Sequence, residues 1–487
     1  MIRVLHVCSE VYPLLKTGGL ADVAGSLPPA LARHDGDVRI LVPGFPAITD
    51  GLPSPRLVAE VPARFGASAV RLYLADFPDT AGIKIYFIDA PGLYDRPGNP
   101  YSDALGKDYA DNHRRFALLG WMAAQLAQGI DPSWGPQVVH GHDWHAGLAP
   151  AYLRAAEHRL GRKLAGTVFT IHNLAYQGVF APYAFGELDL PDYFFNMHGL
   201  EFHGQISFMK AGLFYSDKLT TVSPTYAREI QGAEQGCGLQ GLLNTRSADL
   251  HGILNGVDPL VWNPATDPAI ASNYDAKSLE RKLICKRVLQ EECGLNVQND
   301  APLFTVVSRI TEQKGLNLVQ AGLHDIVQRG GQLVLLGAGD AAMEETFKKA
   351  AQAHPHSVSV HIGYDERRSH RLIAGGDVIL VPSRFEPCGL TQLYGLAYGT
   401  LPLVRRVGGL ADSVVDCTLE NIAEGTATGF VFDHFDSQSF NTAVRRAFAL
   451  YDRKDDWLRV QQAGMRQEFN WDVAAKAFMS LYRQVAA

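Results

Sequence analysis

Short apolar runs recur at a nearly constant interval in the second half of the chain, and this regularity restricts the fold more than any other feature. The runs begin near residues 303, 332, 358, 378, 401 and 429. Their spacing of about 25 residues accommodates one buried strand and one crossover helix. The pattern therefore predicts successive βα units around a mostly parallel sheet, in a doubly wound α/β domain.

The first half of the chain alternates in the same way. Strands are predicted at residues 3–9, 38–42, 84–88, 138–140, 167–171 and 219–222, and helices at 21–33, 109–128, 146–159 and 205–215. A chain of 487 residues exceeds what one hydrophobic core usually holds. We therefore expect two Rossmann-like domains at residues 1–252 and 253–465, joined near the turn-rich segment 251–263. A final helical segment at 466–487 could pack back on the N-terminal domain.

Composition and charge exclude several classes of protein. The net charge is −7 and no basic block is present, which disfavours a nucleic-acid partner. The six cysteines form no C-x-x-C pair, so neither a disulfide framework nor a structural zinc site is expected. No leader-like segment opens the sequence, and no apolar run reaches the roughly 18 residues of a membrane span. We expect a cytoplasmic protein with no membrane partner.

A lysine and two adjacent glycines separate the first predicted strand from the first predicted helix, in "KTGGLADV" at residues 16–23. A strand, a glycine turn and a helix form the opening of a phosphate-binding unit. The alternative is a plain βα turn in which glycine only supplies a positive φ. "PLLKTGGLAD" (13–22) has a partial repeat in "PLVRRVGGLAD" (402–412), which suggests two equivalent turns facing one crevice.

Two further stretches place charged groups at predicted strand ends. "SRITEQKG" (308–315) carries Arg309 and Lys314, which could hold a pyrophosphate or form a solvated surface pair. In "VPSRFEPCGL" (381–390), Glu386 follows a buried strand and could bind sugar hydroxyls or a developing cation, or could only complement a helix dipole. The backbone amides of residues 389–391 are candidate hydrogen-bond donors to a phosphate.

Metal and dinucleotide sites are weighed against simpler interpretations. His140, His142, Asp143 and His145 could form a metal cluster. Strand alternation, however, sends His140 and His142 to one face and Asp143 to the other, so no metal is expected. "VLLGAGD" (334–340) lacks the third glycine of a dinucleotide fingerprint, and a turn after a strand is favoured there.

Seven motifs together resemble those of the bacterial glycogen synthase and plant starch synthase family. They run in order along the chain as "KTGGLADV", "HDWHAG", "HNLAYQG", "SRITEQKG", "LLGAGD", "PSRFEPCGLTQLY" and "VGGLAD". The segment between them at 203–230, "HGQISFMKAGLFYSDKLTTVSPTYAREI", is similar too. The resemblance implies a GT-B fold, with two doubly wound Rossmann-like domains facing an interdomain cleft. It also implies retaining transfer of glucose from ADP-glucose to the non-reducing 4-hydroxyl of an α-1,4-glucan such as glycogen, with no cofactor.

The resemblance also implies roles for individual residues. The catalytic set consists of Glu386, His172, Asp143, Lys314 and Arg309. Asp143 and His172 would surround the transferred glucose together with Asn255, and Arg309 and Lys314 would hold the diphosphate. The remaining substrate-binding residues are Lys16, Gly18 and Gly19 at the phosphates, Tyr364 on the adenine, and Cys388, Gly389, Leu390 and Thr391 in the loop whose backbone amides bind phosphate. Where related retaining transferases have a second glutamate eight positions after the first, with seven residues between the two, this chain has Tyr394, which leaves a second acidic role unfilled.

Physical chemistry is consistent with these roles. Cleavage of the anomeric C–O bond leaves negative charge on a diphosphate, and fixed cations stabilise that charge more in the transition state than in the bound substrate. No side chain is an evident nucleophile, which favours attack from the leaving-group face. Three alternatives remain: another retaining nucleotide-sugar transferase, a nicotinamide oxidoreductase disfavoured by the glycine pattern at Gly337, and a non-catalytic glucan-binding homologue. A preference for ADP over UDP does not follow from the residues themselves.

Overall fold

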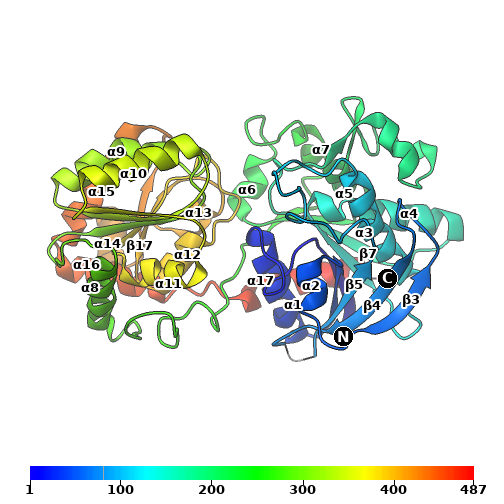
Figure 1. Ribbon diagram of the computed structural model, residues 1–487, viewed down its shortest axis with the longest axis horizontal. Coiled ribbons are helices and arrows are strands. Elements are labelled where there is room, and N and C mark those ends of the chain that lie inside the picture. The colour runs from blue at the N-terminus through cyan, green and yellow to red at the C-terminus, as the bar shows by residue number, and fades with distance from the viewer. Residues whose placement is uncertain (81, 487) are drawn as a thin grey trace. The chain divides into compact units, whose positions relative to one another are not determined.

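The computed structural model describes residues 1–80 and 82–486, and the chain divides into two compact units (Figure 1). Unit 1 comprises Met1–Gly256 together with the C-terminal segment Trp471–Ala487, and unit 2 comprises Val257–Asn470. Among the described residues, no helix is both long enough and apolar enough to cross a membrane.

Unit 1 is built on a nine-stranded sheet in the order β12-β11-β7-β6-β1-β2-β5-β4-β3. The seven strands from β12 to β5 pair in parallel with their neighbours, while β4 runs antiparallel to both β5 and β3 at one edge. The strands are β1 (Ile2–Val7), β2 (Gly36–Pro43), β3 (Arg56–Val61), β4 (Val70–Asp76), β5 (Lys84–Asp89), β6 (Val138–His142), β7 (Gly166–Ile171), β11 (Lys218–Thr221) and β12 (Leu250–Gly252). The order changes direction between β1 and β6, and in doubly wound sheets ligands bind outside the carboxyl ends of the strands at that point.

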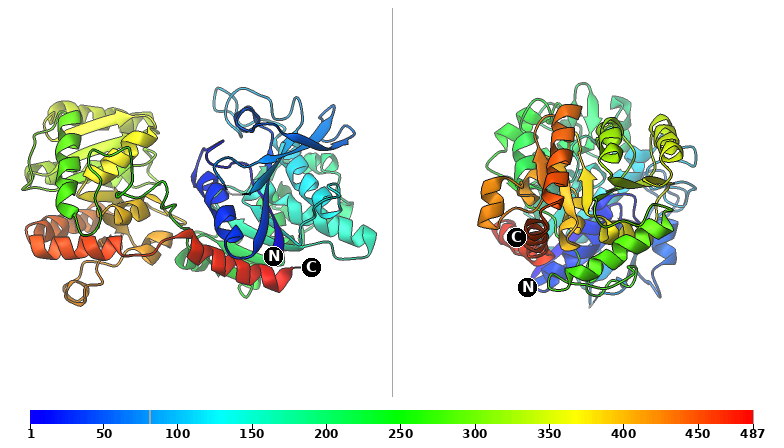
Figure 2. Two further views of the ribbon diagram at one scale, coloured as in Figure 1. Left: turned by 90° about the horizontal axis from the view of Figure 1, so that it is seen from below. Right: turned by 90° about the vertical axis from the view of Figure 1, so that its left-hand side faces the viewer.

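Helices cover both faces of this sheet. They are α1 (Gly19–Ala32), α2 (Pro46–Asp50), α3 (Asn112–Ala127), α4 (Leu148–Leu160), α5 (Phe208–Tyr215), α6 (Pro224–Glu229), α7 (Gln240–Thr245) and α17 (Trp471–Val485), with short 3-10 turns η1 (Trp144–Ala146), η2 (Pro182–Glu187) and η3 (Asp192–Phe194). Helix α17, the red helix of Figure 2, packs against α1 and β7. The C-terminal segment therefore contributes to the core of unit 1.

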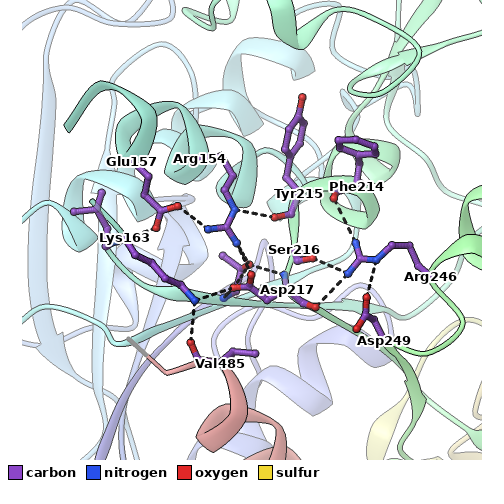
Figure 3. Close-up of polar contacts among 12 residues, drawn as sticks. Arg154, Glu157, Lys163, Phe214, Tyr215, Ser216, Asp217, Arg246, Asp249 and Val485 are labelled. Carbon is purple, nitrogen blue, oxygen red and sulfur yellow. Dashed lines mark hydrogen bonds and ion pairs between the residues drawn. The ribbon is translucent and has the colours of Figure 1, made fainter. Parts of the chain in front are cut away.

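A polar network fixes the start of β7 relative to its neighbours (Figure 3). Arg154 on α4 donates to Asp217 at 2.7 Å and to Glu157 at 2.6 Å. Asp217 in turn accepts the backbone N–H of Thr167 at 2.8 Å. Arg246 donates to the carbonyl oxygens that follow α5, including Ser216 at 2.8 Å. These bonds satisfy buried main-chain groups and hold β7 and β11 in register.

Unit 2 is a six-stranded parallel sheet in the order β15-β14-β13-β16-β17-β18. Its strands are β13 (Leu303–Val307), β14 (Gln332–Gly337), β15 (Val358–Ile362), β16 (Val378–Val381), β17 (Leu401–Arg405) and β18 (Phe430–Phe432). Its helices are η4 (Leu279–Arg281), α8 (Lys282–Glu292), α9 (Leu316–Gln328), α10 (Ala341–Ala353), α11 (Glu366–Gly375), α12 (Thr391–Ala397), α13 (Gly408–Ser413), α14 (Leu419–Glu424), α15 (Ser437–Tyr451) and α16 (Lys454–Met465). This is the Rossmann strand order 3-2-1-4-5-6, with the change of direction between β13 and β16.

The six strands predicted from the apolar runs of the second half are confirmed as β13 to β18, and all of them except the edge strand β15 are largely buried. One helix prediction was partly wrong. Residues 205–207 form β10 (Gln205–Ser207), which pairs with β8 (Val179–Phe180) and β9 (Glu201–Phe202), and the helix α5 begins only at Phe208. The side chain of Ser207 accepts the N–H of Lys210 and so caps the helix, a start signal that the apolar spacing alone does not show.

Candidate active site

The loop after β13 brings a lysine to the carboxyl end of β16 in unit 2. Lys314 Nζ lies 2.6 Å from Glu386 Oε2. Gly315, which precedes α9, has φ +73°, and a Cβ there would lie 2.0 Å from the carbonyl oxygen of Pro382. Glycine is therefore required for the two loops to approach, and the pair sits at the change of strand order where ligands are expected.

Glu386 is buried and held on several sides. Its exposed fraction is 7%, and Ser383 Oγ donates to the same carboxylate oxygen at 2.9 Å. Gly408 and Gly409 of the second "GGLAD" motif lie against its loop, since added Cβ atoms would come within 1.9 Å of the Glu386 carbonyl and 2.1 Å of the Cys388 carbonyl. The second motif thus fixes the Glu386 loop by close backbone packing.

A small pocket surrounds this pair at the N-terminus of α12. It is lined by Val307, Ser308, Lys314, Leu380, Val381, Ser383, Glu386, Gly389, Leu390 and Thr391. Gly389 has φ +71°, and α12 begins at Thr391, whose hydroxyl lies 3.4 Å from the Val307 carbonyl. Cys388 is buried at the base of the loop. A helix N-terminus beside a lysine is a suitable place for a phosphate.

Asp143 marks the carboxyl end of β6 in unit 1. Its carboxylate accepts the backbone N–H of His172 at 2.7 Å and that of Asn173 at 3.3 Å. Burial raises the pKa of this carboxyl to about 7, against the opposing effect of those two donors. Asp143 also adopts φ +55° and ψ −178°, a region that side chains rarely occupy. Strain and a costly buried carboxyl at one residue are typical of functional sites.

His172 and Asn255 are also in unit 1. Burial lowers the pKa of His172 to about 3, so the imidazole is neutral. Its Nε2 atom lies 3.0 Å from Nδ1 of His142. Asn255 is 9% exposed and follows β12. The structure therefore brings Asp143 and His172 together, and it places Asn255 beyond another strand end of the same sheet.

In the "KTGG" loop, the carboxylate of the buried Glu10 binds backbone amides that could otherwise bind a phosphate. Its carboxylate accepts the amides of Thr17 and Gly18, and it also bonds to the hydroxyls of Thr17 and Tyr101. Helix α1 begins at Gly19, and a Cβ added at Gly18 would meet nothing within 4 Å. Lys16 pairs with Asp22 at 2.9 Å. The first motif is therefore open above Gly18, unlike the tightly packed second motif.

Arg309 and Tyr364 are exposed in unit 2. Ser308 Oγ donates to the backbone carbonyl of Arg309 at 3.1 Å, but among the described residues none forms a hydrogen bond or ion pair with the Arg309 guanidinium. Tyr364 is 74% exposed, lies between β15 and α11, and bonds to Glu366. Both side chains are therefore accessible to a ligand from solvent.

Tyr394, at the place where a second glutamate would be expected, is part of an aromatic stack. The Trp262 ring lies 3.8 Å, centroid to centroid, from both Tyr394 and His370, and is nearly parallel to both. His370 and Tyr398 each bond to Asp267. This position therefore packs α12 against the start of unit 2 and supplies no acidic group.

The structure contains a histidine cluster other than the one considered from the sequence. His6, His140 and His142 bring ring nitrogens within 4.8 Å of one another, and no other such group occurs in residues 1–80 and 82–486. His6 and Glu10 were missed by sequence reasoning. They lie in and just after the first strand, and only the parallel pairing of β1 with β6 places His6 beside His140.

Comparison with known proteins finds a family match in each of the two units. The family model "Starch synthase catalytic domain" matches residues 3–245, and "Glycosyl transferases group 1" matches residues 292–459. Two relatives named glycogen synthase, from Francisella tularensis subsp. novicida and Francisella philomiragia subsp. philomiragia, are each 59% identical over 485 residues. The match covers 99% of this chain with both relatives, and 99% and 100% of the respective relatives.

Solved structures give the same assignment. The catalytic domain of starch synthase IV from Arabidopsis thaliana, bound to ADP and acarbose, is similar with a TM-score of 0.90 and 31% identity, covering 99% of each chain. A sucrose-phosphate synthase from Thermosynechococcus elongatus shares the fold at a TM-score of 0.60 and 16% identity, also over 99% of each chain. The resemblance found in the motifs is thus confirmed: the chain belongs to the family of bacterial glycogen synthases and plant starch synthases, and it has their GT-B fold.

Proposed function

We propose that the chain transfers glucose from ADP-glucose to the non-reducing 4-hydroxyl of an α-1,4-glucan, with retention of the anomeric configuration, and so lengthens glycogen in the cytoplasm. The observation that carries the proposal is the pair formed by Lys314 and the buried Glu386 beside the α12 N-terminus, at the change of strand order in unit 2. The relatives' name, glycogen synthase, and the ADP and acarbose bound to starch synthase IV support it. Incorporation of radiolabelled glucose into glycogen tests it.

Lys314, Arg309 and Lys16 would stabilise the departing diphosphate. Charge gathers on that group as the anomeric C–O bond breaks, and preorganised cations favour the transition state over the bound donor. Lys314 is already held by Glu386, whereas Arg309 is exposed and its guanidinium makes no bond in the described part of the chain. The amides of Gly389, Leu390 and Thr391 would add dipoles at the α12 N-terminus.

The glucosyl group would be held by Asp143, His172, Asn255 and Glu386. Glu386 would bind the donor sugar and favour the positive charge that develops at its ring. Attack by the acceptor hydroxyl from the leaving-group face retains the configuration without an enzyme nucleophile. The departing phosphate oxygen takes the proton of that hydroxyl, so the step needs no enzyme base. This route suits a site in which the buried carboxylate already has a lysine partner.

We expect activity to survive chelation, since side-chain cations and helix amides would meet the charge of the diphosphate. Incorporation of label from ADP-glucose into glycogen should be the same after dialysis against EDTA as before it. A loss of incorporation that is restored by a divalent ion would contradict this part of the proposal.

ADP-glucose should be the preferred donor, with a higher kcat/KM than UDP-glucose. The phenol ring of Tyr364 is 74% exposed, and an exposed ring can stack on a purine. Measuring kcat/KM for both donors in wild type and in Tyr364→Ala tests this, with Tyr183→Ala, another exposed tyrosine, as the control. The preference should shrink in Tyr364→Ala alone. Equal values for the two donors in wild type would contradict the prediction.

A further inference from the structure

A continuous series of hydrogen bonds runs through the interior of unit 1 and ends at His172. We call this series the histidine chain; its members, in order, are Thr220, Thr170, His140, Tyr482, His6, His142 and His172. Thr170 Oγ1 bonds to Thr220 and lies 2.6 Å from His140 Nε2. The hydroxyl of Tyr482, on α17, lies 2.7 Å from His140 Nδ1 and 3.3 Å from His6 Nε2. His6 Nδ1 then lies 2.9 Å from His142 Nε2, and His142 Nδ1 lies 3.0 Å from His172 Nε2.

All four imidazoles of the histidine chain are neutral. Burial lowers the pKa of His6 and of His172 to about 3, and it lowers the pKa values of His140 and His142 well below their usual range. A neutral imidazole has one N–H donor and one acceptor nitrogen. Each interior ring therefore donates on one side and accepts on the other, so that all the rings must point the same way.

The number of available protons decides the direction in which the hydrogen bonds of the histidine chain run. Seven groups bring one proton each, four from imidazoles and three from hydroxyls, but only six hydrogen bonds join them. One proton is left over, at the Thr220 end or at the His172 end. Thr220 is fully buried, and its hydroxyl bonds to no described group other than Thr170. An unpaired buried donor there would cost roughly 1–3 kcal/mol.

The surplus proton therefore belongs at the other end. His172 is only part-buried, and its Nδ1 atom bonds to no described protein group. With Thr220 donating to Thr170, every later group donates onwards, through Tyr482 to His6 and from His142 to His172 Nε2. All four rings then carry their proton on Nδ1.

We propose that the histidine chain holds His172 with its proton on Nδ1, so that His172 presents an N–H donor to an oxygen atom of the donor sugar. Tyr482 and His6 are then positioning residues, which act on the substrate only through His172. The sugar contact rests on the proposed function, whereas the position of the proton does not. A donor whose direction is already set costs no reorganisation when the sugar binds.

A metal ion at His6, His140 and His142 is the competing interpretation. In the histidine chain, the Nε2 lone pairs of His6, His140 and His142 that such an ion would need already accept hydrogen bonds, from Tyr482, Thr170 and His6 respectively. The two arrangements exclude one another, so a single set of measurements separates them.

Nitrogen NMR on protein labelled with ¹⁵N-histidine tests the proposal directly, because couplings between ring nitrogens and carbon-bound protons distinguish the two tautomers. His172→Gln assigns the His172 signals by their disappearance. We expect His172 and the three buried rings each to be neutral and protonated on Nδ1. Protonation of His172 on Nε2, a mixture of tautomers, or stoichiometric transition metal in the purified protein would overturn the proposal.

Tyr482→Phe tests whether the coupling reaches His172. Tyr94→Phe is the matched control, because Tyr94 is equally buried in unit 1 and its hydroxyl donates to the Arg115 carbonyl, outside the histidine chain. Removing the Tyr482 hydroxyl should shift the ring-nitrogen signals of His6, His142 and His172 and lower kcat/KM severalfold. Tyr94→Phe should change neither the signals nor kcat/KM.

Identical His172 signals in the two variants would overturn the coupling between Tyr482 and His172. Shifted signals with unchanged kcat/KM would overturn the sugar contact alone and would leave the proposed transfer reaction standing. The wild-type spectrum decides the position of the proton even if Tyr482→Phe fails to fold.

Discussion

Replacing Glu386 with alanine should lower the rate of glucose incorporation into glycogen at least about a hundredfold, the loss typical of removing one preorganised electrostatic group. Glu386 is 7% exposed, bonded to Ser383 and paired with Lys314 at 2.6 Å, so its carboxylate has one defined position. Removing it takes away the group proposed to hold the donor sugar. Lys314 remains available for the diphosphate, so calorimetric titration should still show ADP binding.

Glu312→Ala provides the control for Glu386→Ala. Glu312 is an exposed carboxylate in the loop after β13, paired with Arg384, and it does not line the pocket around Lys314. Its loss should leave both incorporation and ADP binding near wild type, since exposed ion pairs contribute little. Near-normal turnover in Glu386→Ala would remove Glu386 from the mechanism.

Lys16→Ala should slow incorporation by about a hundredfold, comparable to the loss of one oxyanion donor. The loop around Lys16 is held by Glu10 and open above Gly18, and Lys16 itself pairs with Asp22 at 2.9 Å. We expect this lysine to leave Asp22 for the diphosphate as the anomeric bond breaks. ADP should still bind through unit 2, where Arg309 and Lys314 lie.

Lys84→Ala is the matched control for Lys16→Ala. Lys84 is also a lysine of unit 1 paired with an aspartate, Asp76, but it lies on β5, towards the edge of the sheet. Both variants should keep the wild-type melting temperature, and only Lys16→Ala should lose activity. Full activity in Lys16→Ala would show that "KTGG" is a plain turn between β1 and α1.

Most strands of the second unit could be predicted because they are short apolar runs that are almost wholly buried, as in β13, β14, β16, β17 and β18, and such runs leave a clear signal. The edge strand β3 and its neighbour β4 gave no such signal, since both include polar residues and neither is buried along its whole length. The mixed segment at 205–215 was assigned to helix throughout because apolar spacing does not locate a cap such as Ser207.

Residues of the candidate site were predictable only where each lies in a recognisable local motif. "SRITEQKG" and "FEPCGL" place Lys314 and Glu386 at strand ends, and the parallel sheet then brings the two ends together. The contacts of Glu10 and the histidine chain depend on pairings between distant segments, such as Tyr482 with His6 across 476 positions. No local pattern encodes these contacts, which follow from strand order and from the packing of α17 on unit 1.

The most direct test of the account combines radiolabelled ADP-glucose, glycogen and the purified protein, followed by proton NMR of the lengthened chains. The account predicts label in the polymer, release of one ADP for each glucose added, and new linkages that are exclusively α-1,4 at the non-reducing ends. Release of free glucose without transfer, or β-configured linkages, would contradict retaining glucosyl transfer by this chain.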